Sequence, residues 1–198
     1  MKKKCIVLFL VIFLLVGCTA VRIDTASIDN IIDVVLSKNN KLYNHMSIGC
    51  KYYVPRGVSY IDSNGSNDKL YSNGVYYYLY LDKIEYYYKN SLKYKTDNSK
   101  YYSKQIKNGK SVGYLEITEK GNNEYLVEFV YNYAKVEALT SKEEMANVIL
   151  NSSYILSTIK YNKDVVKYTM SDESSSEKKY EEFTSKRETD SFLGYEER

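Results

Sequence analysis

The sequence predicts an α+β domain in which an antiparallel sheet of five to seven strands is flanked by an N-terminal and a C-terminal helix. Apolar residues recur at helical spacing over residues 28–36 and again over 145–159. The chain between these segments instead alternates with the period of two that is typical of β-strands. Short clusters of turn residues separate the alternating runs, which favours antiparallel neighbours.

The N-terminal helix is expected to follow Ser27, or alternatively Thr25, since either hydroxyl can cap the first turn. Asn39-Asn40 is expected to end it. The C-terminal helix is expected to start at Ser141–Glu144, a capping box whose Ser and Glu side chains satisfy each other's backbone donors. It is expected to end at Lys160-Tyr161-Asn162.

The strands are expected between and after these helices. The clearest alternation places Val75, Tyr77, Leu79 and Leu81 on one face of a strand, and Tyr76, Tyr78 and Tyr80 on the other. A polar loop is expected from Ser63 to Asp68. The predicted strands are Met46–Val54, Val58–Asp62, Val75–Leu81, Ile84–Lys89, an edge strand near Tyr101–Lys107, a hairpin of Val112–Thr118 with Glu124–Tyr133, and a last strand at Val165–Met170.

The chain begins with a secretory pattern. Lys2, Lys3 and Lys4 precede an unbroken apolar run over residues 6–16, the order of a signal peptide. The run is too short for a transmembrane helix, which needs about 20 residues. Leu15-Val16-Gly17-Cys18 resembles the bacterial lipobox. The resemblance implies cleavage before Cys18 and attachment of a diacylglyceryl group to its thiol. The alternative is a free cysteine at the end of an anchor helix.

Four segments follow from these patterns: a signal peptide over 1–17, a lipid-anchored tether over 18–24, a single α+β domain over 25–170 and an acidic tail over 171–198. The tail is expected to be disordered, because it has too few apolar residues to offset its ordering entropy. The lipobox implies a lipoprotein on the extracytoplasmic face of the cell membrane. Abundant Lys, Asn, Tyr and Ile, which have AT-rich codons, indicate a low-GC Gram-positive bacterium.

Charge and cysteine content exclude several classes of partner and site. The whole chain carries a net charge of +3, and loss of the three leader lysines brings the mature chain to zero. We therefore expect no nucleic-acid partner, since such proteins present a basic patch. Cys5 leaves with the leader and Cys18 is lipidated, so Cys50 remains alone. A single thiol makes neither an intramolecular disulfide nor a promising structural zinc site.

Two short stretches of the mature domain resemble PsbP/Mog1-like domains. The segment 52–58, Tyr-Tyr-Val-Pro-Arg-Gly-Val, looks like the strand and Pro-x-Gly turn that open these domains. The segment 155–161, Ile-Leu-Ser-Thr-Ile-Lys-Tyr, is similar to the helix end that closes them. Val58 stands where the family often has Trp. The resemblance implies a small exported protein whose work is binding or assembly.

Catalytic chemistry has few candidate residues. His45 is the only histidine, and it is five residues from Cys50. Odd spacing in an extended strand places two side chains on opposite faces, so a dyad requires a turn between them. The alternative is a surface histidine and a small buried thiol. The carboxylate pairs Asp82/Glu85, Glu143/Glu144 and Asp172/Glu173 fit solvated charges or caps.

Metal and cofactor sites are not indicated. The loop Asp62–Asp68 contains oxygen ligands and a glycine, but it lacks the EF-hand order and the closing Glu. Calcium binding there is the alternative to an ordinary turn. Glycine-rich phosphate loops are absent from the sequence. We expect no metal site and no cofactor.

The tyrosines support the leading hypothesis, a non-catalytic binding or assembly module with an envelope protein as partner. Tyr76, Tyr78 and Tyr80 form a ladder that can anchor a partner with little entropy loss. The alternatives are that helices cover this face, or that codon bias and strand preference explain the 24 tyrosines. An envelope hydrolase using His45 is the runner-up function, and an assembly factor in sporulation or wall maintenance is the third.

Overall fold

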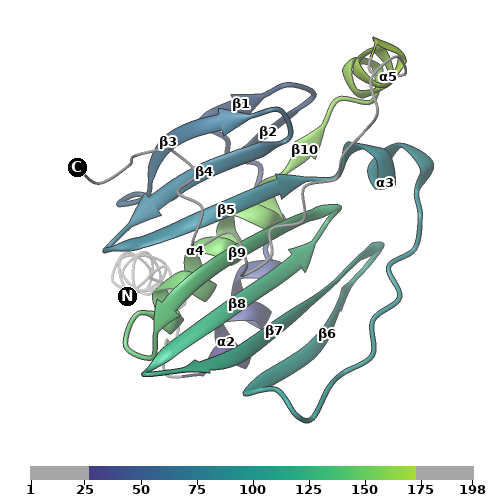
Figure 1. Cartoon of the computed structure of the whole chain (residues 1–198). Helices are drawn as coiled ribbons and strands as arrows, with labels where there is room; N and C mark the ends of the chain where they lie inside the picture. The colour runs from purple at the N-terminus through teal and green to yellow at the C-terminus, as the bar shows by residue number, and fades with distance from the viewer. Residues whose placement is uncertain (1–26, 173–198) are drawn as a thin grey trace, which may run out of the picture.

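The computed structural model describes residues 27–172, and it confirms the predicted class (Figure 1). A seven-stranded antiparallel sheet has the order β3-β4-β5-β9-β8-β7-β6, and a three-stranded sheet has the order β1-β2-β10. The predicted signal peptide and tether, and the tail beyond Asp172, lie outside the described residues. The helices are α2 (Ile28–Ser37), α3 (Lys83–Tyr88), α4 (Met145–Thr158) and α5 (Lys163–Asp172). The strands are β1 (His45–Ser47), β2 (Cys50–Tyr52), β3 (Ser59–Asn64), β4 (Asn67–Ser72), β5 (Val75–Leu81), β6 (Tyr102–Asn108), β7 (Ser111–Gly121), β8 (Glu124–Tyr131), β9 (Ala134–Ser141) and β10 (Lys160–Tyr161).

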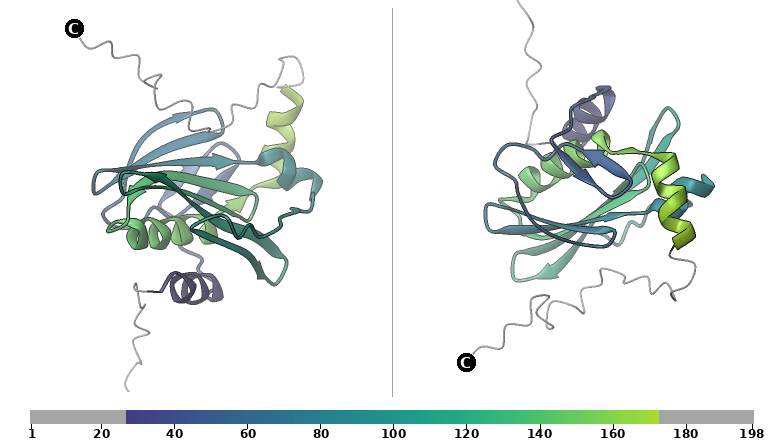
Figure 2. Two further views of the ribbon diagram at one scale, coloured as in Figure 1. Left: turned by 60° about the horizontal axis from the view of Figure 1, so that its bottom comes forward. Right: turned by 90° about the horizontal axis from the view of Figure 1, so that it is seen from above.

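Helices α2 and α4 lie on the same face of the large sheet (Figures 1 and 2). Helix α4 contacts β8 and β9 directly, and α2 packs against α4. Ser27 caps α2 as predicted, because its Oγ accepts a hydrogen bond from Asn30 N. Burial of the apolar stripes of both helices against the sheet forms one continuous core. Its largest fully buried side chains include Tyr52, Tyr77, Phe129, Ile31, Ile32, Leu70, Leu79, Leu81, Leu115 and Ile117.

Several strand predictions are confirmed with small shifts at their ends. Strand β5 spans Val75–Leu81 as predicted, and its even-numbered and odd-numbered side chains alternate in burial. The predicted edge strand is β6, which lies at the edge of the large sheet. The predicted hairpin is β7–β8. Its turn uses Asn122 and Asn123, both with positive φ, a conformation that Asn tolerates better than most residues.

The prediction of one strand over Met46–Val54 is wrong. The segment forms two short strands, β1 and β2, that pair with each other around a turn. Gly49 has a φ of +82° there, and a Cβ at this position would approach Val166 Cγ2 to 3.1 Å. The turn therefore requires glycine and brings α5 close to the hairpin.

Two predicted strands are helices instead. Ile84–Lys89 falls in α3, because Asp82 Oδ1 accepts from Glu85 N and caps the first turn. Val165–Met170 falls in α5, whose first turn is capped by Asn162 Oδ1 through the backbone N of Asp164 and Val165. Both caps are local, but the apolar and aromatic residues that follow them also suit strands, so periodicity alone was misleading.

Three strands, β4, β9 and β10, occupy segments where none was expected. Strand β10 lies where the C-terminal helix was expected to end, since α4 already ends at Thr158. The predicted loop from Ser63 to Asp68 contains the end of β3 and the start of β4, joined by a tight turn at Gly65 with a φ of +63°. Strand β9 pairs with both β5 and β8 in the centre of the sheet. It ends at Ser141, so Ser141 does not cap the C-terminal helix, which begins at Met145 after Glu144.

Candidate functional site

The large sheet has one face that no helix or strand of residues 27–172 covers, and we call it the open face. The predicted ladder lies there: Tyr76, Tyr78 and Tyr80 point away from the core, and Tyr76 is 44% exposed. Tyr77 points to the opposite face, where its hydroxyl accepts a hydrogen bond from Asn151 of α4 at 3.1 Å. The alternative that helices cover the tyrosine ladder is therefore wrong for the described part of the chain.

A row of three carboxylates crosses the open face beside the ladder. Tyr78 pairs across strands with Glu137, Glu137 with Glu128, and Glu128 with Glu116. Like charges directly opposite each other on adjacent strands are destabilising. Lysines bind the two outer glutamates: Lys135 Nζ lies 2.8 Å from Glu137 Oε1, and Lys100 Nζ lies 3.0 Å from Glu116 Oε1. The row is thus a charged network rather than an apolar surface.

The segment 89–101, which we call the strap, joins α3 to β6 and runs along the β6 side of the sheet (Figure 1). Tyr94 fixes it to the open face. Its ring stacks on Tyr114 with centroids 4.1 Å apart and planes 2° apart. Its hydroxyl donates to Glu116 Oε2 at 2.9 Å and shares a hydrogen bond with Ser103 Oγ at 2.7 Å. Desolvation, together with the nearby charge of Glu116, raises the pKa of the Tyr94 phenol.

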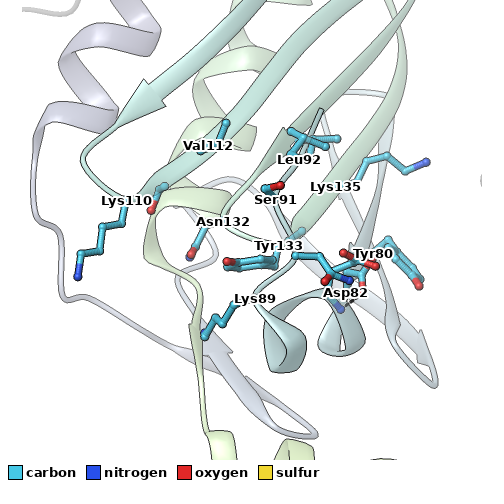
Figure 3. Close-up of a pocket in the computed structure, with 15 residues that line it drawn as sticks. Tyr80, Asp82, Lys89, Ser91, Leu92, Lys110, Val112, Asn132, Tyr133 and Lys135 are labelled. Atoms are coloured by element: carbon cyan, nitrogen blue, oxygen red, sulfur yellow. Dashed lines mark hydrogen bonds between the residues drawn. The ribbon is translucent and has the colours of Figure 1, made fainter. Parts of the chain in front are cut away.

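A pocket of about 530 Å³ lies on the open face, at the end of the sheet next to α3 (Figure 3). Ser91 and Leu92 of the strap form part of its wall. Its floor comes from the strands and the β8–β9 turn, through Val112, Val130, Tyr133 and Ala134. Tyr80, the last member of the ladder, also lines it. The pocket and the ladder therefore belong to one surface.

Lysines outnumber carboxylates in the lining. Lys89, Lys110 and Lys135 line the pocket together with Asp82 and Glu85. Asp82 serves as the cap of α3, and its burial raises the pKa of its carboxyl. Lys89 Nζ lies 3.5 Å from the centre of the Tyr86 ring. Desolvation, and then the charge of Lys163, lower the pKa of Lys89.

An aromatic cluster fixes α3 beside the pocket. Tyr86 of α3 stacks on Tyr161 of β10 with centroids 4.3 Å apart, and it meets Tyr133 edge-on at 5.8 Å. The Tyr161 hydroxyl donates to the Tyr133 carbonyl oxygen. The same carbonyl accepts from Asp82 N at 2.9 Å. These contacts attach α3, which precedes the strap, to the β8–β9 turn. Because residues of both segments line the pocket, the contacts fix the distance between two of its walls.

His45 and Cys50 do not form an activated dyad. The chain does turn between them, and pairing of His45 with Tyr52 and of Ser47 with Cys50 places both side chains on one face of the hairpin. However, the His45 ring stacks on Tyr60 at 4.3 Å. Cys50 is buried, and desolvation together with the charge of Asp68 raises its pKa to about 12. A protonated thiol is a poor nucleophile.

The acidic residues of the Asp62–Asp68 segment and of the Glu143/Glu144 pair do not gather into one site, and Glu173 of the third pair lies outside the described residues. In the Asp62–Asp68 segment, Asp62 is exposed, whereas Asp68 is 1% exposed and accepts from the Tyr52 hydroxyl at 2.6 Å. These oxygens do not converge on a cation site. Glu143 accepts from Asn123, and Glu144 precedes α4. Within residues 27–172, no group of three or more His, Cys, Asp or Glu side chains is placed to hold a metal ion.

Sequence reasoning missed the pocket and its lysines. Lys89, Lys110 and Lys135 are far apart in sequence and belong to no motif. Of the lining residues, only Tyr80 had a sequence signal, through the alternation of strand β5. The sheet order brings the other lining residues together, and that order is not a local property of the chain.

Comparisons with family models, curated proteins and solved structures found no match for this chain. In the part that the structure describes, no helix is long and apolar enough to cross a membrane. The resemblances to the lipobox and to PsbP/Mog1-like domains therefore stay predictions.

Proposed function

We propose that this chain is a lipoprotein held by lipid on Cys18 at the extracytoplasmic face of a bacterial membrane, where it works as a non-catalytic binding or assembly module. The observation that carries the binding role is the open face. Its opposite side forms the core with α2 and α4, yet the open face presents Tyr76, the charged network and a pocket. Large aromatic side chains on an accessible surface are typical of binding interfaces.

The anchor is tested by replacing its cysteine. The Cys18→Ala variant is expected to lose incorporation of labelled fatty acid and to accumulate as uncleaved precursor, because the thiol is the acceptor that the lipobox implies. The Cys5→Ala variant is the control. It changes the cysteine inside the leader and is expected to be processed normally. A mature protein that starts elsewhere and fractionates without membranes would overturn the anchor.

The binding face is tested by cross-linking in intact cells. The Tyr78→Ala/Tyr80→Ala variant is expected to lose partners that the unchanged protein captures, because it removes two rings from the open face. Tyr43→Ala/Tyr53→Ala is the matched control, since these tyrosines flank or follow the strands of the small sheet. Equal unfolding midpoints of both variants would show that the fold is intact. An identical set of partners for the two variants would contradict the proposal.

A further inference from the structure

The pocket on the open face has the dimensions of a small-molecule site. Its volume of about 530 Å³ lies within the range of roughly 300–1,000 Å³ that ligand pockets usually have. Such pockets combine an apolar lining with a few polar groups that fix orientation. Here Val112, Val130 and Ala134 provide the apolar floor, and the ring of Tyr133 adds an aromatic surface.

Two of the lining lysines have no carboxylate partner in the described part of the chain. The ion pairs among residues 27–172 are made by Lys100, Lys104 and Lys135, and neither Lys89 nor Lys110 takes part in one. Figure 3 shows Lys89 and Lys110 extending toward one side of the pocket and Lys135 toward the other. Because Lys135 is bound to Glu137, the lining lysines that no ion pair of residues 27–172 engages are Lys89 and Lys110, both on the same side of the pocket.

The end of α3 determines the position of Lys89 beside the pocket. Lys89 follows α3 as a C-cap with a left-handed backbone, so the end of the helix sets where its side chain starts. Its Nζ lies 3.5 Å from the centre of the Tyr86 ring, and desolvation and then the charge of Lys163 lower its pKa. An anion beside two ammonium groups would be stabilised by both of them.

We propose that this pocket binds an anionic amphiphile, with a carboxylate or phosphate group between Lys89 and Lys110 and an apolar body on Val112, Val130 and Tyr133. The inference rests on the proposed binding function, because it names a ligand class for the same face.

The pocket lies at the far end of the sheet from the start of α2. Asp29, near the start of α2, binds Lys104 and Tyr102 near the start of β6. Leu36, near the end of α2, accepts from Asn108 at the end of β6. The pocket residue Lys110 follows in the β6–β7 turn, so the pocket lies at the end of the sheet opposite to the point where the anchored chain enters α2.

The experiment measures binding to the purified mature chain by calorimetry, at concentrations below micelle formation. The four probes are decanoate, decyl phosphate, decyltrimethylammonium and inorganic phosphate. Decanoate and decyl phosphate are expected to bind with one site per chain. Decyltrimethylammonium has the same tail with the opposite charge, and inorganic phosphate has the charge without a tail. Each control probe is expected to bind about tenfold more weakly or not at all. The cationic probe lacks the attraction to the lysines, and inorganic phosphate lacks the apolar contact with the pocket floor.

Three variants locate the binding. Lys89→Gln/Lys110→Gln is expected to weaken decanoate binding about tenfold, because it removes both ammonium groups. Lys38→Gln/Lys41→Gln is the matched control, since these exposed lysines follow α2 and do not line the pocket. Val130→Phe fills the floor and keeps the lysines, so it is expected to weaken decanoate and decyl phosphate alike. Unfolding midpoints establish that each variant folds.

The proposal is overturned if no anionic amphiphile binds, if the cationic probe binds equally well, or if the Lys89/Lys110 variant keeps full affinity. These results are separable from a failure of the proposed function. Absence of amphiphile binding alongside loss of partners in the Tyr78/Tyr80 variant would remove the ligand class and leave the binding role. Amphiphile binding with an unchanged partner set would keep the ligand class and remove the partner-binding role of the tyrosine face.

Discussion

A buried hydrogen bond between the two sheets gives the sharpest test of the fold. Tyr52 of β2 and Asp68 of β4 are 0% and 1% exposed, and the tyrosine hydroxyl donates to Asp68 Oδ2 at 2.6 Å. The other carboxylate oxygen, Oδ1, is buried without a hydrogen-bond partner in the described chain. In the Tyr52→Phe variant the ring stays, and the only hydrogen-bond donor that residues 27–172 provide to this carboxylate is lost. Hydrogen bonds to charged groups contribute about 1.5–3 kcal/mol.

We therefore expect Tyr52→Phe to lower the free energy of unfolding by about 2–3 kcal/mol, because a buried carboxylate remains unpaired. For a domain of this size that corresponds to a melting temperature lower by roughly 4–12 °C. Urea unfolding followed by circular dichroism measures the change. Tyr60→Phe is the control, since Tyr60 is 40% exposed, and such surface changes usually stay within about 0.5 kcal/mol.

A double variant tests the cause of this loss. Tyr52→Phe/Asp68→Asn removes the charge together with its donor, so it is expected to be more stable than the sum of the two single changes predicts. The reasoning would be refuted if Tyr52→Phe unfolded at the same urea concentration as Tyr60→Phe, or if the two changes at Tyr52 and Asp68 were additive.

Three further predictions concern single residues. Gly113→Ala is expected to cost about 1–3 kcal/mol or more, because its Cβ would lie 2.0 Å from the Val130 carbonyl oxygen of β8; Ser111→Ala in the same strand is the control, and equal urea midpoints would contradict the clash. Cys50 is expected to resist alkylation at neutral pH until the domain unfolds, because its pKa is raised from 9.0 to about 12. Since the folded pKa is the higher one, the stability that the neutral thiol contributes is complete below pH 9 and is lost as the pH rises toward 12. Alkylation of Cys50 at pH 7 in a folded Cys5→Ser/Cys18→Ser chain, which keeps no other cysteine, would contradict the expected resistance. His45→Ala is expected to leave any envelope hydrolase activity and the partner set unchanged, because the ring packs on Tyr60 and the Cys50 thiol on the same hairpin face has a raised pKa; loss of a hydrolytic activity would restore the runner-up function.

The elements that the sequence predicted correctly have strong local signals. The apolar stripe after Ser27 and the alternation of Val75–Leu81 both match the observed elements. Each signal depends on spacing within one segment, and side-chain direction follows directly from that spacing. The hairpin of β7 and β8 likewise follows from a turn sequence between two alternating runs.

The elements that were predicted wrongly have weak or competing signals. Residues 84–89 and 165–170 carry aromatic and β-branched side chains, yet each follows a side-chain cap, at Asp82 or Asn162, and forms a helix. Strand β9 alternates apolar and charged residues over Ala134–Ala138, but Ala, Lys and Glu have low strand preference. Its place in the sheet depends on pairing with β5 and β8. Tertiary pairing overrides local preference in such segments.

The sequence by itself determined the α+β class and which tyrosines share a face, and it predicts the secretory leader and the lipobox. These are properties of composition and local spacing, so they need no knowledge of distant contacts. The tertiary structure alone decided that α2 and α4 cover the face with Tyr77 and leave the ladder of Tyr76, Tyr78 and Tyr80 on the open face. It also decided the pocket, because the strand order, and not the chain order, brings Lys89, Lys110 and Lys135 to one site.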